Sequence, residues 1–177
     1  MRSSDTGELI LENVEVPDTQ RLGNIDSGVL DTLRILDRGR ITIGALAVGL
    51  GRGALEESVR YARERTAFGQ PISEFQGLRW MMADMKTEVD AARLLVHRAA
   101  WLADAGQPYT REASMAKLFA SEAATRACGK AVQIHGGYGY TREFPVERYL
   151  RDAKLCEIGE GTSQVQRMVI AKHVLRS

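Results

Sequence analysis

The most regular hydrophobic pattern in the chain follows Ser73. Apolar residues recur there at alternating spacings of four and three, as they do along an amphipathic helix packed in a bundle. These residues are Leu78, Met82, Met85, Val89, Ala92, Val96 and Ala99. Ser73 and Gln76 are spaced as a capping box at the start, and residues 106–108 (Gly-Gln-Pro) are a typical stop. The pattern predicts one long helix between these two signals.

A second helix is expected to begin at Thr110, a favourable N-cap residue, with Glu112 suited to the positive end of the helix dipole. Its apolar stripe consists of the small residues Ala116, Ala120, Ala123, Ala127 and Ala131, followed by Ile134. Because small side chains let helix axes approach closely, we expect this helix to lie at the centre of the bundle.

A third long helix is predicted before these two, over about residues 26–65. We expect one face of it to carry Ile41, Gly44, Ala45 and Val48. Glycines at positions 44, 49, 51 and 53 each cost up to about 1 kcal/mol in a helix interior, so close packing is expected to explain them. A short helix over about 145–152 and a final helix from Ser163 complete the set. Ser163 and Gln166 are spaced as a second capping box.

Residues 8–17 have a different pattern. Val14 and Val16 alternate with Glu15, and residues 9–11 form a further apolar run, which favours a strand. A single strand has no partner for its backbone groups. We therefore expect the strand to pair with another molecule, or the chain to be the tail of a longer protein. The predicted architecture is an all-α bundle with one unpaired strand.

Composition narrows the function classes. The 177 residues carry 24 Lys and Arg against 23 Asp and Glu, a net charge of +1 that gives no electrostatic footprint for nucleic acid or an anionic membrane. Two cysteines, Cys128 and Cys156, are too few for a disulfide framework or a zinc site. The longest nearly apolar run, residues 41–51, is far short of the roughly 20 residues of a spanning helix. No secretory signal pattern follows Met1. We expect a soluble, cytoplasmic protein without a metal.

Glu160 lies between Gly159 and Gly161, just before the final predicted helix. An acid at this position suits the helix dipole, which is the ordinary explanation for a single Glu. Flanking glycines also permit close backbone approach to a ligand, and a carboxylate in a pocket can act as a general base. The residues alone leave both interpretations open.

Residues 133–140 (Gln-Ile-His-Gly-Gly-Tyr-Gly-Tyr) end the second predicted helix. Gly136 and Gly137 are explained as an αL C-cap, or as a turn whose backbone N–H groups meet a phosphate. No P-loop Lys-Ser/Thr pair and no preceding strand are found, so neither common nucleotide motif applies. His135 has no second His or acid at helical spacing, and we interpret it as structural.

Arg65 closes the first predicted helix, and Phe68 and a Gly-Gln-Pro turn at 69–71 follow it. An arginine at a helix C-terminus complements the dipole. Beside an aromatic ring and a glycine turn, the same arginine could hold a diphosphate while the ring packs on a flat cofactor.

Taken together and in this order, these segments closely resemble the acyl-CoA dehydrogenase family. The matching residues are Arg40-Ile41, Tyr61-Ala62, Arg65, Phe68-Gly69, Pro71-Ile72, Phe75-Gln76, Gln133-Ile134, Gly136-Gly137, Gly139-Tyr140, the run Arg151-Asp152-Ala153-Lys154 and the run Glu160-Gly161-Thr162-Ser163. The resemblance covers nearly the whole chain. It implies that residues 1–25 are the remnant of a middle β-domain with its linker. It also implies that residues 26–177 form the family's C-terminal, up-and-down four-helix bundle, in a chain truncated relative to the family.

The resemblance implies an activity as well. Family members use FAD to introduce a double bond between the α and β carbons of an acyl-CoA, commonly passing electrons to an electron-transfer flavoprotein. Glu160 matches the base that takes the α-proton, while the flavin takes the β-hydride. The Glu160 N–H would help to bind the thioester oxygen. The family's cofactor and substrate positions also carry over to this chain.

The implied FAD-binding residues are Arg65, Phe68, Gln76, Gln133, Ile134, His135, Gly136, Gly137, Thr162, Ser163 and Gln164, and the implied substrate-binding residues are Asp37, Arg40 and Gly161. Arg65, Gln76 and the turn at 133–137 would reach the FAD of a neighbouring subunit in a homodimer or homotetramer. For Asp37 and Arg40, an exposed helix charge is the alternative explanation.

Two departures from the family bear on the substrate. Some members carry the base just before the arginine that matches Arg40, where this chain has Gly39, so the base is assigned to Glu160. The residue before the base is often tyrosine but here is Gly159, which could admit a branched or larger acyl group. Two other functions remain open: a non-catalytic helical oligomerisation fragment, and an acyl-CoA oxidase that passes electrons to oxygen.

Overall fold

The computed structural model describes residues 7–176, in which five α-helices dominate. The helices are α1 (Gly28–Glu64), α2 (Gln76–Asp104), α3 (Thr110–His135), α4 (Val146–Ile158) and α5 (Ser163–Val174). The connections include the 3₁₀ turns η1 (Asp18–Gln20), η2 (Ile72–Glu74) and η3 (Gly136–Tyr140), and the hairpin of β1 (Thr66–Ala67) and β2 (Gln70–Pro71).

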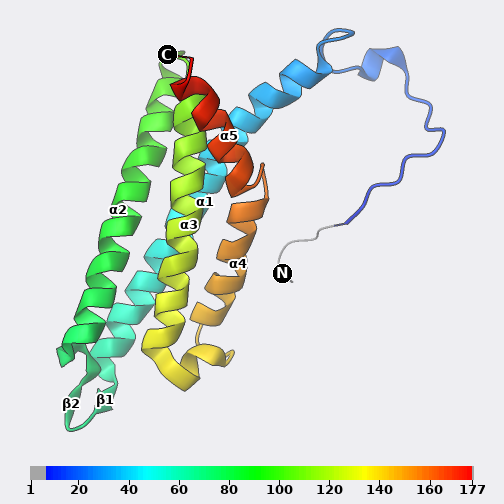
Figure 1. The fold of residues 1–177 in the computed structure, drawn as a ribbon. Helices are drawn as coiled ribbons and strands as arrows, with labels where there is room; N and C mark the ends of the chain where they lie inside the picture. The colour runs from blue at the N-terminus through cyan, green and yellow to red at the C-terminus, as the bar shows by residue number, and fades with distance from the viewer. Residues whose placement is uncertain (1–6, 177) are drawn as a thin grey trace.

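The helices form an up-and-down bundle around α3. Figure 1 shows α1 to α4 running side by side in alternating directions, with α5 against the upper part of the bundle. The α3 helix packs against each of the other four helices and against η3. Both the predicted four-helix bundle and the central place of α3 are confirmed, and α5 adds a fifth helix on one side.

The core is built from small side chains, as the sequence predicted. The stripe of α3 is buried, and that of α2 is buried from Met85 to Ala99, while Leu78 and Met82 are half-buried. The expected face of α1 is partly wrong, because Ala45 is exposed. The buried residues of α1 are Arg40, Gly44, Ala47, Gly51, Ala54, Ser58 and Ala62.

Close packing explains two of the four glycines of α1, Gly44 and Gly51, whereas a Cβ on Gly53 would make only ordinary van der Waals contact. A Cβ on Gly44 would lie 3.0 Å from Val96 Cγ2, and a Cβ on Gly51 would lie 3.0 Å from Val89 Cγ2. A Cβ on Gly53 would meet Tyr149 at 3.4 Å, whereas one on Gly49 would meet nothing within 4 Å. The expectation is therefore wrong for Gly49, which is exposed.

The predicted start signals of α2 and α3 are wrong in detail. Ser73 lies in η2, and the N-cap of α2 is Phe75, without a side-chain capping bond. Thr110 is the first residue of α3 rather than its N-cap, and its hydroxyl donates instead to Asp37 Oδ2 at 2.5 Å. At Thr110 a tertiary hydrogen bond to α1 replaces the local cap that the spacing favoured.

The last two helices also differ from the prediction. The α4 helix continues six residues beyond Asp152, to Ile158, because its apolar face stays buried through Ala153 and Cys156. Thr162, not Ser163, caps α5, and its side chain accepts a hydrogen bond from the Val165 N–H at 3.4 Å. The Ser163–Gln166 capping box is therefore wrong by one residue.

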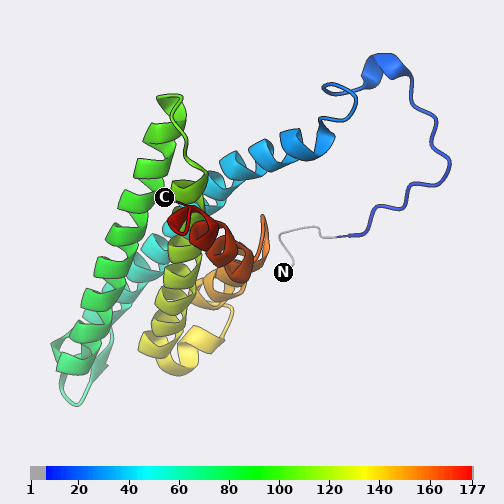
Figure 2. The ribbon, with the colours of Figure 1, turned by 45° about the horizontal axis from the view of Figure 1, so that its top comes forward.

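The predicted strand over residues 8–17 is not found. Residues 7–17 contain no strand and are exposed, and in Figure 2 this segment extends away from the bundle, beyond the first turns of α1. The described part of the chain offers no sheet edge beside it, so its backbone has no hydrogen-bonding partner that would fix an extended strand. No helix within residues 7–176 is long and apolar enough to cross a membrane.

Candidate functional site

The site residues suggested by the sequence gather at two places along α3. The loop that contains Glu160 packs beside Lys117, whose ammonium bonds to the carbonyl of Gly161. The turn at 133–137 lies 18 residues further along the same helix. At a rise of 1.5 Å per residue the two places are roughly 27 Å apart.

Glu160 is held in an unusual backbone conformation between α4 and α5. Its φ of 57° lies in the left-handed region, which costs an L-residue about 1 kcal/mol or more. Gly161 follows with a φ of 92°, a conformation that a glycine adopts without this penalty. The loop thus turns sharply at the acid and places it immediately before the N-terminal end of α5.

The Glu160 carboxylate reaches across to α1 and lies against Gly39. A Cβ built on Gly39 would overlap the carboxylate, so no other residue type fits there without moving the acid. Two positions that are 121 residues apart in the sequence are therefore adjacent in the fold. The space that Gly39 leaves is the space that the carboxylate of Glu160 fills.

Asp37 and Arg40 form a buried ion pair beside this carboxylate. Arg40 Nη1 donates to Asp37 Oδ1 at 2.7 Å, and their side chains are 7% and 15% exposed. Arg40 also reaches Ser114 Oγ at 3.4 Å, while its Nε is buried without a hydrogen-bond partner. The alternative explanation of these residues as exposed helix charges is therefore wrong.

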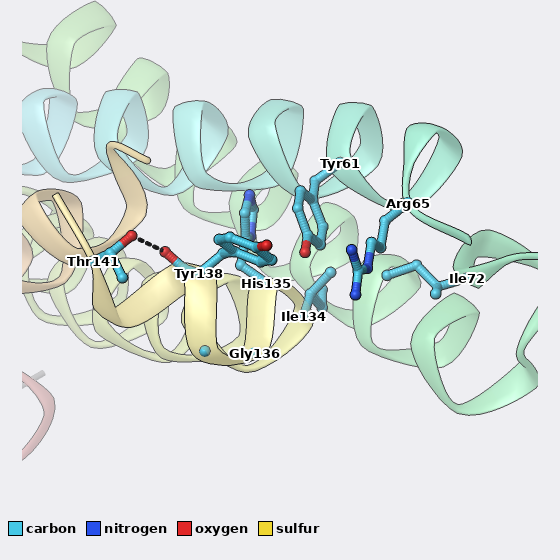
Figure 3. Close-up of a pocket in the computed structure, with 9 residues that line it drawn as sticks. Tyr61, Arg65, Ile72, Ile134, His135, Gly136, Tyr138 and Thr141 are labelled. Carbon is cyan, nitrogen blue, oxygen red and sulfur yellow. Dashed lines mark hydrogen bonds between the residues drawn. The ribbon is translucent and has the colours of Figure 1, made fainter. Parts of the chain in front are cut away.

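A cavity lies at the other end of α3. It has a volume of about 460 Å³ and is lined by Tyr61, Arg65, Ile72, Ile134, His135, Gly136, Gly137, Tyr138 and Thr141. Figure 3 shows Tyr61 and Arg65 of α1 facing Tyr138 across it. The Arg65 guanidinium lies 5.6 Å from the centre of the Tyr138 ring. The cavity thus combines a cation, flat aromatic faces and a glycine turn.

The glycine turn exposes its backbone toward this cavity. Gly136 has φ 58° and ψ −134°, so the positive φ of the predicted C-cap is found but the ψ is not that of an αL residue. A Cβ on Gly136 or Gly137 would meet nothing within 4 Å. Both glycines are exposed and leave room for a ligand, while the Gly136 N–H already donates to the Gln133 carbonyl.

His135 is enclosed in an aromatic cluster at the cavity wall. Its ring stacks on Tyr61 at 4.3 Å between centroids and meets Phe144 edge-on at 5.3 Å. Nδ1 bonds to the Ala131 carbonyl at 2.8 Å, and Nε2 is buried without a partner. Burial lowers the pKa of His135 from its ordinary 6.5. Among residues 7–176, no three His, Cys, Asp or Glu side chains lie close enough together to hold a metal ion.

The remaining candidates divide between the two places. Phe68, Gln76 and Gln133 lie toward the cavity end, and the Phe68 ring is 96% exposed. Thr162, Ser163 and Gln164 lie at the N-terminal end of α5, next to Glu160. The Ser163 hydroxyl is buried without a partner, whereas the Gln164 side chain is exposed.

Sequence reasoning missed two buried polar residues next to Glu160. Lys117 and Gln166 are fully buried, and both donate to the backbone of the Glu160 loop. The available signal was Lys117 itself, which interrupts a buried stripe of α3 between Ala113 and Ala120. A lysine at such a position is almost never fully buried without a partner.

The described chain is a helical bundle with an acid on a glycine-bounded loop and a glycine turn beside a cationic cavity. The sequence profile of the family described as "Acyl-CoA dehydrogenase, C-terminal domain" matches residues 26–175. The chain belongs to the acyl-CoA dehydrogenase family.

Individual relatives agree with this assignment. The probable acyl-CoA dehydrogenase YngJ of Bacillus subtilis is 56% identical over 176 residues, which are 99% of this chain and 46% of that protein. The caffeyl-CoA reductase-Etf complex subunit CarC of Acetobacterium woodii is 48% identical over 97% of this chain and 45% of its own length. The solved butyryl-CoA dehydrogenase of Megasphaera elsdenii superposes with a TM-score of 0.93 at 43% identity, over 94% of this chain and 44% of that one. The chain spans less than half the length of these proteins.

Proposed function

We propose that the chain supplies the C-terminal domain of an FAD-dependent enzyme that introduces a double bond between the α and β carbons of an acyl-CoA. Residues 26–177 would form this domain, with residues 1–25 as the link to a β-domain. One observation carries the proposal: a carboxylate on a sharply turned, glycine-bounded loop reaches into a space left open by Gly39. Family membership supplies the reaction class.

In this proposal Glu160 is the general base that removes the α-proton of the thioester. A proton leaving this carbon needs a carboxylate in line with it and a donor for the thioester oxygen, on which negative charge develops. The Glu160 N–H would be one such donor, and Gly161 would let the acyl chain approach the loop. Bound FAD supplies the acceptor for the β-hydride. Asp37 and Arg40 would bind the substrate near its CoA moiety.

The cavity at the end of α3 fits part of a flavin dinucleotide. Arg65 offers a guanidinium for a diphosphate, Gly136 and Gly137 leave room for a ligand beside the turn, and His135 offers a buried Nε2 that lacks a partner. Gln76, Gln133 and the exposed ring of Phe68 would extend this surface. Thr162, Ser163 and Gln164 would contact the cofactor at the Glu160 end.

The separation of the two places supports a shared site. They lie roughly 27 Å apart along one straight helix, so we propose that the cavity end of each subunit serves the FAD bound beside Glu160 of a neighbour. The assembly would be a homodimer or homotetramer. One relative is named as the subunit of a reductase complex with Etf, which supports an electron-transfer flavoprotein as a partner, and we propose that it is the electron acceptor.

The neighbour of the base favours a particular substrate class. Gly159 has no side chain where the family often has a tyrosine, so there is more room near the reacting carbons. We propose that the enzyme accepts branched or larger acyl groups. A preference for short straight-chain acyl-CoAs in a substrate panel would contradict this.

Replacing Glu160 tests the proposed function directly. In the complete enzyme that contains this chain, Glu160→Gln is expected to keep FAD bound but to lower the rate of flavin bleaching by acyl-CoA by at least about 10²-fold, since general-base catalysis contributes that much. Anaerobic stopped-flow absorbance measures this rate. Glu147→Gln, on the exposed face of α4 and paired with Arg151, is the matched control and is expected to bleach normally.

Three results would redirect the proposal. Rapid bleaching in Glu160→Gln would remove Glu160 from the role of base. A protein that retains no flavin after incubation with FAD and removal of the unbound cofactor would favour the non-catalytic oligomerisation fragment. Stoichiometric peroxide in air would favour an acyl-CoA oxidase.

A further inference from the structure

The loop that carries Glu160 rests on two buried polar side chains from different helices. Lys117 of α3 donates from Nζ to the Gly161 carbonyl at 2.7 Å and to the Glu157 carbonyl at 3.1 Å. Gln166 of α5 donates from Nε2 to the same Gly161 carbonyl at 2.9 Å and to the Glu160 carbonyl at 3.3 Å. The loop backbone is thus held from both sides at the acid.

Burying these two donors costs free energy of folding unless they make hydrogen bonds inside the protein. Lys117 is fully buried, and burial lowers the pKa of its ammonium group. Cys156, Glu157 and Glu160 lie near this ammonium group and favour its charged form, whereas the positive charge of Arg40 disfavours it. An apolar residue would fill the same space in α3 without this desolvation. The carbonyl of Glu157, at the end of α4, is one that the helix itself leaves unpaired.

The two anchors hold Glu160 in a backbone conformation that sets the direction of its side chain. Glu160 has a positive φ, which an L-residue adopts only when the surrounding structure imposes it. The direction of its side chain follows from this backbone, and the carboxylate consequently faces Gly39. If the carbonyls of residues 160 and 161 were released, the loop could relax to an ordinary conformation and the carboxylate would turn away.

We propose that Lys117 and Gln166 are positioning residues, which fix the backbone of Glu160 and Gly161 so that the Glu160 carboxylate points at the substrate α-carbon. Neither side chain touches the reacting atoms. Lys117 provides a charge-assisted anchor for the carbonyls on both sides of the acid, and Gln166 provides the second anchor from α5. This inference rests on the proposed role of Glu160 as the base.

Hydrogen–deuterium exchange of the complete enzyme tests the anchoring without measuring activity. Lys117→Met and Gln166→Met keep side-chain length but remove the donors. The amides of residues 159–162 are expected to exchange about two- to tenfold faster in each variant, because a loop that loses an anchor on its carbonyls opens locally more often, while amides near the cavity at 133–137 stay unchanged. Lys130→Met, on the exposed face of α3 and paired with Asp84, is the control. Unchanged exchange at 159–162 in Gln166→Met would overturn the proposal.

Steady-state kinetics provides the readout that a general packing defect would not give. Misplacement of a base by about 1 Å lowers kcat by up to about 10²-fold, so each variant is expected to lose kcat at least about tenfold while KM for acyl-CoA changes less than threefold. A rise in KM of similar size together with a loss of bound FAD would overturn the positioning role. If Lys117→Met does not fold, Gln166→Met alone decides the question.

The two hypotheses fail in different ways. If Glu160→Gln remains active while the loop amides exchange faster in Gln166→Met, the base assignment fails but the anchoring stands. If Glu160→Gln is inactive and both anchor variants keep full kcat and slow exchange, the positioning role fails and the base assignment stands.

Discussion

The ring of His135 is enclosed by Tyr61 and Phe144, and one of its nitrogens, Nε2, has no hydrogen-bond partner. Protonation would place a charge in this aromatic cluster, where Glu57 provides partial compensation and Arg60 opposes it. Burial therefore lowers the pKa of His135 below the 6.5 of an unfolded chain. The unfolded state consequently binds this proton more tightly than the folded state, so the stabilisation is present above pH 6.5 and is lost as the pH falls below it.

Replacing this histidine should flatten the pH dependence of stability. For His135→Phe we expect a smaller loss in the free energy of unfolding between about pH 6.5 and pH 5 than for the parent chain, because the group that must stay neutral is gone. Urea titrations monitored by circular dichroism at several pH values measure this. His97→Phe, at an exposed position of α2, is the matched control. Identical pH profiles for the parent and His135→Phe would contradict the expectation.

The packing of α1 into the groove between α2 and α3 depends on where its glycines face. Gly51 lies 3.0 Å from Val89 of α2 and 3.6 Å from the Cα of Ala124 of α3, measured from an added Cβ. Gly49, two residues earlier, faces open space. One glycine therefore sets how closely the helices approach, and the other only lowers the helix propensity of α1.

These two glycines should respond in opposite directions to substitution. Gly51→Leu is expected to lower the free energy of unfolding by about 1–3 kcal/mol, as overpacked cores do. Gly49→Ala is expected to raise it by up to about 1 kcal/mol, because alanine favours the helix and meets no neighbour. Thermal and urea unfolding of the two variants provide the comparison. A stabilised Gly51→Leu would show that the interface is loose.

In the whole molecule the two groups of candidate residues lie at opposite ends of one helix, and no motion within a packed bundle can bring them together. Arg65 and the glycine turn share one end, and Glu160 with the start of α5 shares the other. If one cofactor contacts both groups, they must come from different subunits. A symmetric dimer provides this arrangement twice.

Mixing inactive subunits tests this arrangement. Arg65→Ala and Glu160→Gln are each expected to be inactive alone, the first because FAD is lost. In a hybrid dimer, one site combines the intact Glu160 of one subunit with the intact Arg65 of the other, so one of the two sites should recover wild-type acyl-CoA-dependent bleaching. Separately tagged, co-expressed subunits allow the hybrid to be purified. A hybrid without activity would place both residues in the same subunit's site.

The amino-acid sequence was enough to predict the three long helices, the central place of the alanine-rich helix and the resemblance to the acyl-CoA dehydrogenase family. Helical periodicity and stripes of small residues are local properties that can be read directly from the order of residues in the sequence. The local cap signals at Ser73, Thr110 and Ser163 were misleading, since an N-cap depends on which backbone N–H groups the first turn of the folded helix leaves unpaired. The apolar run at 8–17 misled as well, because a strand exists only beside a partner.

The packing of the helices determines which polar residues are buried together. It paired Asp37 with Arg40 inside the bundle, set Glu160 against Gly39 and brought Lys117 and Gln166 to one carbonyl. It also separated the acid from the glycine turn by roughly 27 Å along α3. The contacts of Glu160 with Gly39 and of Lys117 with Gly161 join residues that are dozens of positions apart, and no pattern along the chain specifies the distance between them. The physical reason is that periodicity fixes which face of a helix is buried, whereas the packing of five helices fixes what that face meets.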